Sequence, residues 1–112
     1  MTKKEKGKLL EHYIATLLKE VFNDTSIRPT RGSGNATEIG DVSNSKFFIE
    51  AKNWNKENIT MKYSTWLHLI NQLPINTNKI PLYIFRNNKE KNFVIMEFED
   101  FMRILKDKNA IL

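Results

Sequence analysis

The 112-residue sequence contains no cysteine, which excludes disulfide bonds, cysteine-ligated metal sites and thiol nucleophiles. It contains no apolar run near the roughly 20 residues that a membrane-spanning helix requires, so we expect no membrane partner. The lysine-rich start is followed only by Leu9 and Leu10 before Glu11, so no signal peptide is recognisable and we expect a cytoplasmic protein. Histidine is scarce, and we interpret His12 and His68 as surface or partly buried residues rather than ligands.

The remaining composition is that of a small folded domain. Hydrophobic residues make up 40% of the chain and charged residues 28%, both ordinary for a globular protein. The length fits one domain, residues 1–112, with a single modest core. The net charge of +5 suits a polyanionic partner such as DNA but does not prove one.

Hydrophobic periodicity predicts an α/β fold with a mixed central β-sheet flanked by helices. Helical spacing runs from about residue 4 to residue 22, from 63 to 73, and again over a short segment after residue 97. Strands are expected at 26–31, on both sides of a turn near residue 44, at 80–86 and at 93–98. The expected order is α-β-β-β-α-β-β-α. The apolar stripes of the first and last helices are Leu10, Ile14, Leu17, Leu18 and Val21, and Phe98, Phe101, Met102 and Leu105.

Charged residues interrupt two of these apolar strands. The segments are Gly40-Asp41-Val42 and Phe48-Ile49-Glu50-Ala51-Lys52. Charges are rarely placed in buried strands unless they are paired or bind a metal. Residues i and i+2 of a strand share a face, so Glu50 and Lys52 are expected to point the same way.

The turn between the two segments decides whether their acids meet. A two-residue turn at Asn44-Ser45 would pair Asp41 with Phe48 and place Asp41 on the face of Glu50. The two Cα atoms would then lie roughly 7–8 Å apart. A loop of odd length would send Asp41 to the opposite face.

Two carboxylates at that separation can hold one hard divalent cation. Mg²⁺ takes oxygen ligands at about 2.0–2.1 Å and keeps several waters, so two side chains suffice. Lys52 would offset the negative charge and orient or activate an attacking water. The pattern predicts a metal-dependent phosphodiesterase, and the alternative is an Asp/Glu–Lys salt bridge on a solvated face.

A third acid stands on the first predicted helix. Glu11 lies seven residues before Leu18 and therefore shares the apolar stripe. It either reaches solvent from the edge of the stripe or points at the sheet, near the metal. Glu38 is a further acid near the expected site.

Basic and small residues surround the expected site. Glycine amides can approach a DNA backbone closely, although a loop of this composition is also an ordinary flexible connector. Lys3, Lys4, Lys6 and Lys8 crowd the N-terminus, where a frayed tail is the alternative. The residues expected to contact DNA phosphates are Arg28, Arg31, Gly32, Ser33, Gly34, Lys46 and Lys56.

With these motifs the chain resembles the PD-(D/E)xK nuclease superfamily, and within it the Holliday junction resolvases of archaea and of some phages. The resemblance implies a restriction-endonuclease-like core, with Ser33 close to the scissile phosphate. Gly40 departs from the pattern, because the superfamily's name has proline there. The matching residues are Gly7 and Glu11 of the opening helix, the loop Arg31-Gly32-Ser33-Gly34, and Gly40-Asp41-Val42 with Glu50-Ala51-Lys52.

The resemblance also implies roles for the site residues. Asp41, Glu50 and the backbone carbonyl of Ala51 would be the metal ligands. Lys52 would be the catalytic lysine, and Glu11 the helix acid near the metal. The expected cofactor is Mg²⁺, with Mn²⁺ able to substitute.

The function implied is a Mg²⁺-dependent, structure-selective DNA endonuclease that resolves Holliday junctions, acting as a homodimer because symmetric cutting needs two sites. A phage or mobile-element origin fits the small size and the resemblance. Fold-level likeness leaves two alternatives open. One is a monomeric nicking, restriction-type or repair-type nuclease of the same superfamily. The other is a non-catalytic DNA-binding module, which the joint presence of Asp41, Glu50 and Lys52 disfavours.

Overall fold

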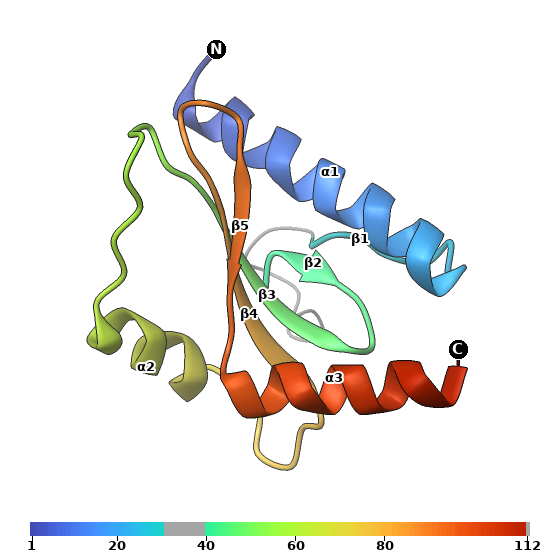
Figure 1. Ribbon diagram of the computed structural model, residues 1–112. Helices are drawn as coiled ribbons and strands as arrows, with labels where there is room; N and C mark the ends of the chain where they lie inside the picture. The colour runs from blue at the N-terminus through green and yellow to red at the C-terminus, as the bar shows by residue number, and fades with distance from the viewer. Residues whose placement is uncertain (31–39, 112) are drawn as a thin grey trace.

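A computed structural model describes residues 1–30 and 40–111, with side chains as far as Asp107. The described segments contain three helices and five strands (Figure 1). The predicted α/β class and order of elements are confirmed. The elements are α1 (Lys3–Phe22), β1 (Arg28–Pro29), β2 (Val42–Ser43), β3 (Phe47–Asn53), α2 (Tyr63–Asn71), β4 (Ile80–Arg86), β5 (Asn92–Ile95) and α3 (Phe98–Ile111).

The strands form two hydrogen-bonded groups. In the larger, β3 runs parallel to β4, and β4 pairs antiparallel with β5, which makes a mixed sheet of order β3-β4-β5. The parallel pair requires a crossover, and α2 supplies it. In the smaller group, β1 pairs antiparallel with β2. A bond from the Asp41 N–H to the Ile49 carbonyl oxygen (2.6 Å) connects the approach to β2 with β3.

This bond shows that the predicted hairpin register is wrong. Asp41 lies opposite Ile49 rather than Phe48, and β2 forms its ladder with β1 instead of β3. The carbonyl oxygen of Asp41 accepts from the Thr30 N–H (3.1 Å). The backbone of Asp41 therefore bonds on one side to Thr30 and on the other to Ile49. Asp41 therefore lies just outside the ladders of β1 with β2 and of β3 with β4. The alternation of side chains along a strand does not determine where its side chain points.

The turn that follows is closed by a side chain. The amide of Asn44 donates to the carbonyl oxygens of Val42 (3.0 Å) and Phe47 (3.1 Å). Its side-chain oxygen accepts from the N–H groups of Lys46 (3.0 Å) and Phe47 (2.6 Å). Asn44 thus replaces the ladder bonds of a two-residue hairpin, and this explains the shifted register.

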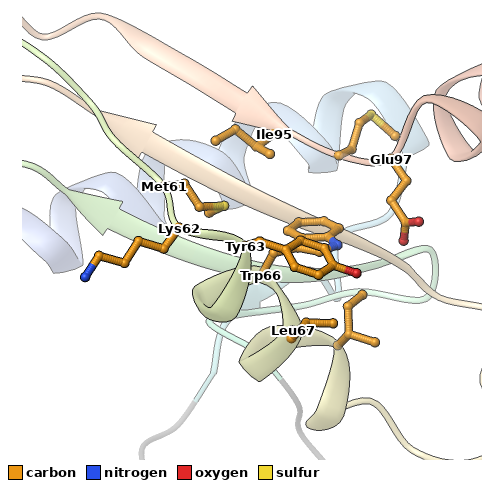
Figure 2. A pocket seen from close by; sticks show the side chains of 9 residues that line it. Met61, Lys62, Tyr63, Trp66, Leu67, Ile95 and Glu97 are labelled. Carbon is orange, nitrogen blue, oxygen red and sulfur yellow. The ribbon is translucent and has the colours of Figure 1, made fainter.

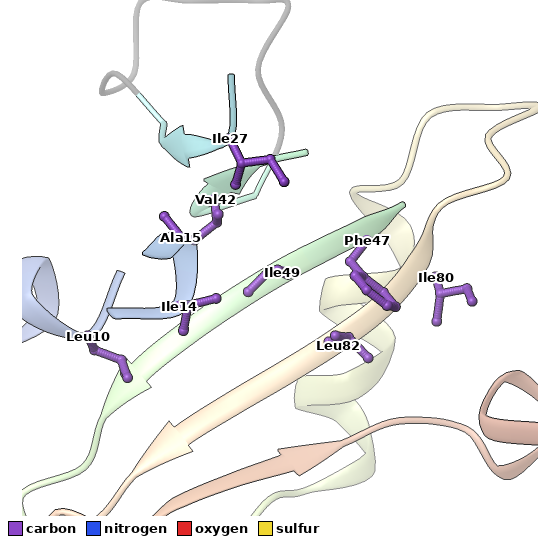
Figure 3. Close-up of a cluster of buried hydrophobic side chains, with 9 residues drawn as sticks. All are labelled: Leu10, Ile14, Ala15, Ile27, Val42, Phe47, Ile49, Ile80 and Leu82. Atoms are coloured by element: carbon purple, nitrogen blue, oxygen red, sulfur yellow. The ribbon is translucent and has the colours of Figure 1, made fainter. Parts of the chain in front are cut away.

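The core is divided between the two faces of β3, because consecutive side chains of a strand alternate. Phe47 and Ile49 join the side covered by α1, where Leu10 is also fully buried (Figure 3). Phe48 joins the other side, under Trp66 of α2. The α1-side cluster consists of Leu10, Ile14, Ala15, Ile27, Val42, Phe47, Ile49, Ile80 and Leu82.

The lysine-rich start belongs to a regular helix. Thr2 Oγ1 accepts from the Glu5 N–H (3.1 Å), and the Glu5 carboxylate accepts from the Thr2 N–H (3.4 Å) and hydroxyl (2.9 Å). This reciprocal capping box is worth about 1 kcal/mol at a helix start. The alternative of a frayed tail is therefore wrong, and α1 begins at Lys3.

Two predicted apolar faces are less buried than expected. In α1 the packed stripe is Leu10, Ile14 and Ala15, whereas Leu17 and Val21 are exposed. In α3 all four residues expected to share a face are exposed, whereas Ile104 packs on the core. Periodicity identified a helix correctly in each case but gave no information on what covers its apolar side. The exposed α3 residues are Phe98, Phe101, Met102 and Leu105.

Candidate active site

Asp41 is held against β3 by two hydrogen bonds. Its N–H donates to Ile49, and its Oδ2 accepts from the N–H of Ala51 (2.7 Å). The preceding Gly40 has a φ of +73° and passes so close to Ile49 that an added Cβ would lie 2.7 Å from the Ile49 carbonyl oxygen. Backbone contact, rather than a shared strand face, therefore brings the Asp41 carboxylate next to Glu50 on β3.

Three acids interact electrostatically at this edge of the sheet. The pKa of Glu50 is raised to about 7, mainly by burial and then by the charges of Asp41 and Glu11, against the lowering effect of Lys52. Burial also raises the pKa of Asp41, against the opposing effect of the Ala51 N–H. The pKa of Glu11 is raised by burial and then by Asp41, and it is lowered by Lys8. Glu11 of α1 therefore faces the sheet.

The cluster carries more negative charge than its neighbours offset. Partly buried carboxylates whose pKa values rise together favour a bound cation, since the cation stabilises their ionised forms. Among the described residues, no three acid or histidine side chains are arranged to hold a metal together. Carboxylates such as those of Asp41 and Glu50 are the type of ligand that a hard cation such as Mg²⁺ takes, with waters completing its coordination.

Lys52 completes the D…ExK pattern at the exposed end of β3. Its ammonium lies 5.8 Å from the centre of the Trp54 ring. The Trp54 ring meets Phe85 edge-on at 6.0 Å, and the backbone N–H of Trp54 donates to the Arg86 carbonyl oxygen (2.6 Å). Trp54 therefore rests on β4.

Sequence reasoning missed a polar wall around Glu50. Tyr83 pairs with Glu50 in the parallel ladder, and its pKa is raised by burial and then by Glu50 and Asp41. With Glu50 and Tyr83, a hollow of about 40 Å³ is lined by three polar residues of the α2 segment, at spacings of three and four. The spacing of these residues was visible in the sequence, but their direction depends on how α2 crosses the sheet. They are Thr65, His68 and Gln72.

The residues expected to bind DNA are scattered. Lys46 precedes β3 and forms an ion pair with Asp107 of α3 (3.2 Å), whereas Lys56 lies beyond the other end of the strand. The Arg28 guanidinium donates to the Pro29 carbonyl oxygen (3.4 Å). Arg31, Gly32, Ser33, Gly34 and Glu38 lie outside the described residues.

Family comparison adds independent information on this site. A family model described as "Phage putative PDDEXK endonuclease" matches residues 2–112. The chain belongs to this family. The resemblance to the PD-(D/E)xK nuclease superfamily is thereby confirmed, and so is its phage type. No curated protein and no solved structure matches the chain. In the part of this family member that the structure describes, no helix is long and apolar enough to cross a membrane.

We expect the acid cluster to make the stability of the metal-free protein fall as pH rises. Glu50 has a pKa of about 7 in the folded chain, above its ordinary value of 4.5. Between these values the folded state keeps a proton that the unfolded state releases, so raising the pH costs stability. Removing the charge in Glu50→Gln should flatten the dependence of Tm on pH and give a higher Tm than wild type at pH 8 in EDTA.

The control is Glu20→Gln, which makes the same change on the exposed side of α1. Its Tm should follow wild type at every pH. A wild-type Tm that rises steadily from pH 5 to 8 without metal would contradict the clustering of the acids.

Proposed function

We propose that this PDDEXK family member is a Mg²⁺-dependent DNA endonuclease that resolves four-way junctions, with Mn²⁺ able to replace Mg²⁺. The observation that supports this function best is the convergence of Asp41, Glu11 and Glu50 beside Lys52. Such a cluster would be unfavourable in a chain that bound DNA without hydrolysing it, because ionised carboxylates repel phosphates.

Each residue takes a distinct role in this proposal. Asp41, Glu50 and the Ala51 carbonyl would hold the cation, with Glu11 beside them. A bound divalent cation would polarise the scissile phosphate and acidify a water. The Ala51 N–H fixes the orientation of the Asp41 carboxylate (2.7 Å). Lys52 would hold the phosphate and orient the attacking water by hydrogen bonding, since its ammonium provides three donors.

Junction resolution requires two such sites, and we infer a two-fold symmetric homodimer. The exposed apolar residues of α3 support an interface there. Close to the start of α3, a hollow of about 680 Å³ between α2 and the end of β5 is lined by apolar residues such as Met61, Trp66 and Ile95 (Figure 2). Contact between copies would remove this apolar surface from water.

The test is cleavage of a labelled four-way junction in Mg²⁺, beside plain duplex and single strand, with the particle mass measured in parallel. We expect paired symmetric nicks on the junction and a mass of twice 13.2 kDa. If a monomer cut plain duplex, the protein would be a nicking, restriction-type or repair-type nuclease and not a junction resolvase. Tight binding without cutting in Mg²⁺ or Mn²⁺ would indicate a DNA-binding module.

A further inference from the structure

Two clefts lie side by side beyond the C-terminal end of β3. The first, of about 420 Å³, is lined by Lys3, Lys52, Trp54 and Lys56. Asn53 and Asn55 line this cleft and also the second one, of about 240 Å³, so that they form the wall between the two. The clefts are therefore neighbours, and the first includes the lysine of the D…ExK motif.

The second cleft lies where α1 meets the turn between β4 and β5. Its charged residues are Lys6, Arg86 and Glu90, and Asn87 and Asn88 of the turn also line it. The N-terminal end of α1 lies beside this turn (Figure 1). Because Lys3 and Lys6 are three residues apart on a helix, they share one side of α1, and one lysine reaches each cleft.

The elements that carry these cations are fixed in place. The capping box holds the first turn of α1. Arg86 Nε donates to Asn92 Oδ1 (2.8 Å), and the guanidinium lies 5.0 Å from the centre of the Tyr13 ring. Inside the turn, the buried Asn87 side chain donates to the Glu57 carbonyl oxygen (3.2 Å) and accepts from two backbone N–H groups of its own turn. Little backbone ordering entropy would then be lost when a ligand binds.

The charges of the lining residues indicate the chemical type of ligand that the clefts would bind. Five cations and one carboxylate line the two clefts, with side-chain amides between them. This combination suits a chain of phosphates, since amides and ammonium groups both donate to phosphate oxygens while Glu90 alone opposes them. At the opposite end of β3, Lys46 is already paired with Asp107.

We propose that the two clefts, from Lys52 across Asn53 and Asn55 to Arg86, bind successive phosphates of the DNA strand next to the point of cleavage. This inference rests on the proposed nuclease function and gives the direction in which the strand leaves the site. It assigns Lys3 and Lys6 a role in binding that Lys46 does not share.

The test compares two double variants in an Asp41→Asn background, which is expected to slow cutting enough for binding to be measured. Lys3→Gln/Lys6→Gln removes one cation from each cleft. Lys4→Gln/Lys19→Gln removes the same charge from α1 at positions that line neither cleft. Affinity for a labelled junction is measured by fluorescence anisotropy at several salt concentrations. Far-ultraviolet circular dichroism confirms that each variant is folded.

We expect the cleft variant to lose affinity about 5- to 20-fold and its salt dependence, as log Kd against log salt, to fall by about 1.8, or 0.9 per phosphate contact. The control variant should change affinity less than about 2-fold by general electrostatics. Equal losses in the two variants would overturn the inference, as would a cleft variant indistinguishable from the parent, and in both cases the nuclease function would stand. Absence of DNA binding and cutting by the wild-type chain would remove the proposed function and the inference together.

Discussion

Asp41→Asn is expected to lower the rate of DNA cleavage on the order of 10³-fold, because loss of a metal ligand forfeits several kcal/mol of transition-state stabilisation. The substitution keeps size and shape, and the side-chain oxygen of asparagine can still accept from the Ala51 N–H, as the Asp41 carboxylate does (2.7 Å). What disappears is the negative charge that a cation would bind. The fold and the position of the side chain should therefore persist while the chemistry fails.

Affinity separates a metal ligand from a residue that merely holds the site together. Removing one carboxylate from the cluster of Glu11, Asp41 and Glu50 lessens its repulsion of phosphate, so the variant should bind DNA at least as tightly as wild type. It should also require a higher Mg²⁺ concentration for any residual cutting. Single-turnover cleavage over a Mg²⁺ titration, with Kd measured in EDTA, provides both quantities.

Asp24→Asn is the matched control. Asp24 lies in the exposed turn after α1, where its carboxylate accepts from the N–H (2.9 Å) and hydroxyl (2.6 Å) of Ser26. Cleavage by this variant should equal that of wild type. If Asp41→Asn cut at the wild-type rate and with the wild-type Mg²⁺ requirement, Asp41 would not be a metal ligand. The proposed active site would then be wrong.

The parts of the fold that depend on local sequence were predictable. The strand at 80–86 matches β4 in full, because a continuous apolar run between turn residues identifies a buried strand. The helix at 63–73 ends two residues earlier, at Asn71, although its start at Tyr63 is correct. The proximity of Asp41 and Glu50 also followed from their motif, although the predicted hairpin register was wrong.

The parts that depend on tertiary contacts were not predictable. Nothing in the residue order shows that the Asn44 side chain would close the turn and shift the strand pairing. The pairing of Glu50 with Tyr83 follows from the parallel register, which in turn depends on how α2 packs. The exposure of the apolar α3 face was unpredictable for the same reason. Periodicity identifies the apolar side of a helix but not which other element packs against it.

Gly40→Ala is expected to destabilise the fold by about 2–4 kcal/mol, because alanine would combine a strained backbone with a steric clash. Gly40 has a φ of +73°, and a Cβ there would lie 2.7 Å from the carbonyl oxygen and 3.0 Å from the nitrogen of Ile49. Both are backbone atoms of β3, so neither can rotate away. The superfamily's name has proline at this position, but proline is confined to a φ near −65°, and Gly40→Pro should be worse than alanine.

Gly7→Ala is the control for the general effect of removing a glycine. Gly7 lies within α1, and nothing lies within 4 Å of an added Cβ. Alanine there should stabilise the protein by about 1 kcal/mol through helix propensity. Urea denaturation of the two variants should therefore shift the midpoint in opposite directions. Two stabilising alanines would show that Gly40 does not need its left-handed conformation.

The same substitution also tests how Asp41 reaches Glu50. The clash at Gly40 can relax by movement of the backbone away from Ile49. That movement would weaken the hydrogen bonds from Asp41 to Ile49 (2.6 Å) and from Ala51 to Asp41 (2.7 Å). Cleavage by folded Gly40→Ala should accordingly fall at least about 10-fold at low temperature, since small displacements of catalytic groups are costly. If Gly40→Ala were destabilised but fully active, the loss of stability would be independent of cleavage. The position of the Asp41 carboxylate would then not depend on this backbone contact.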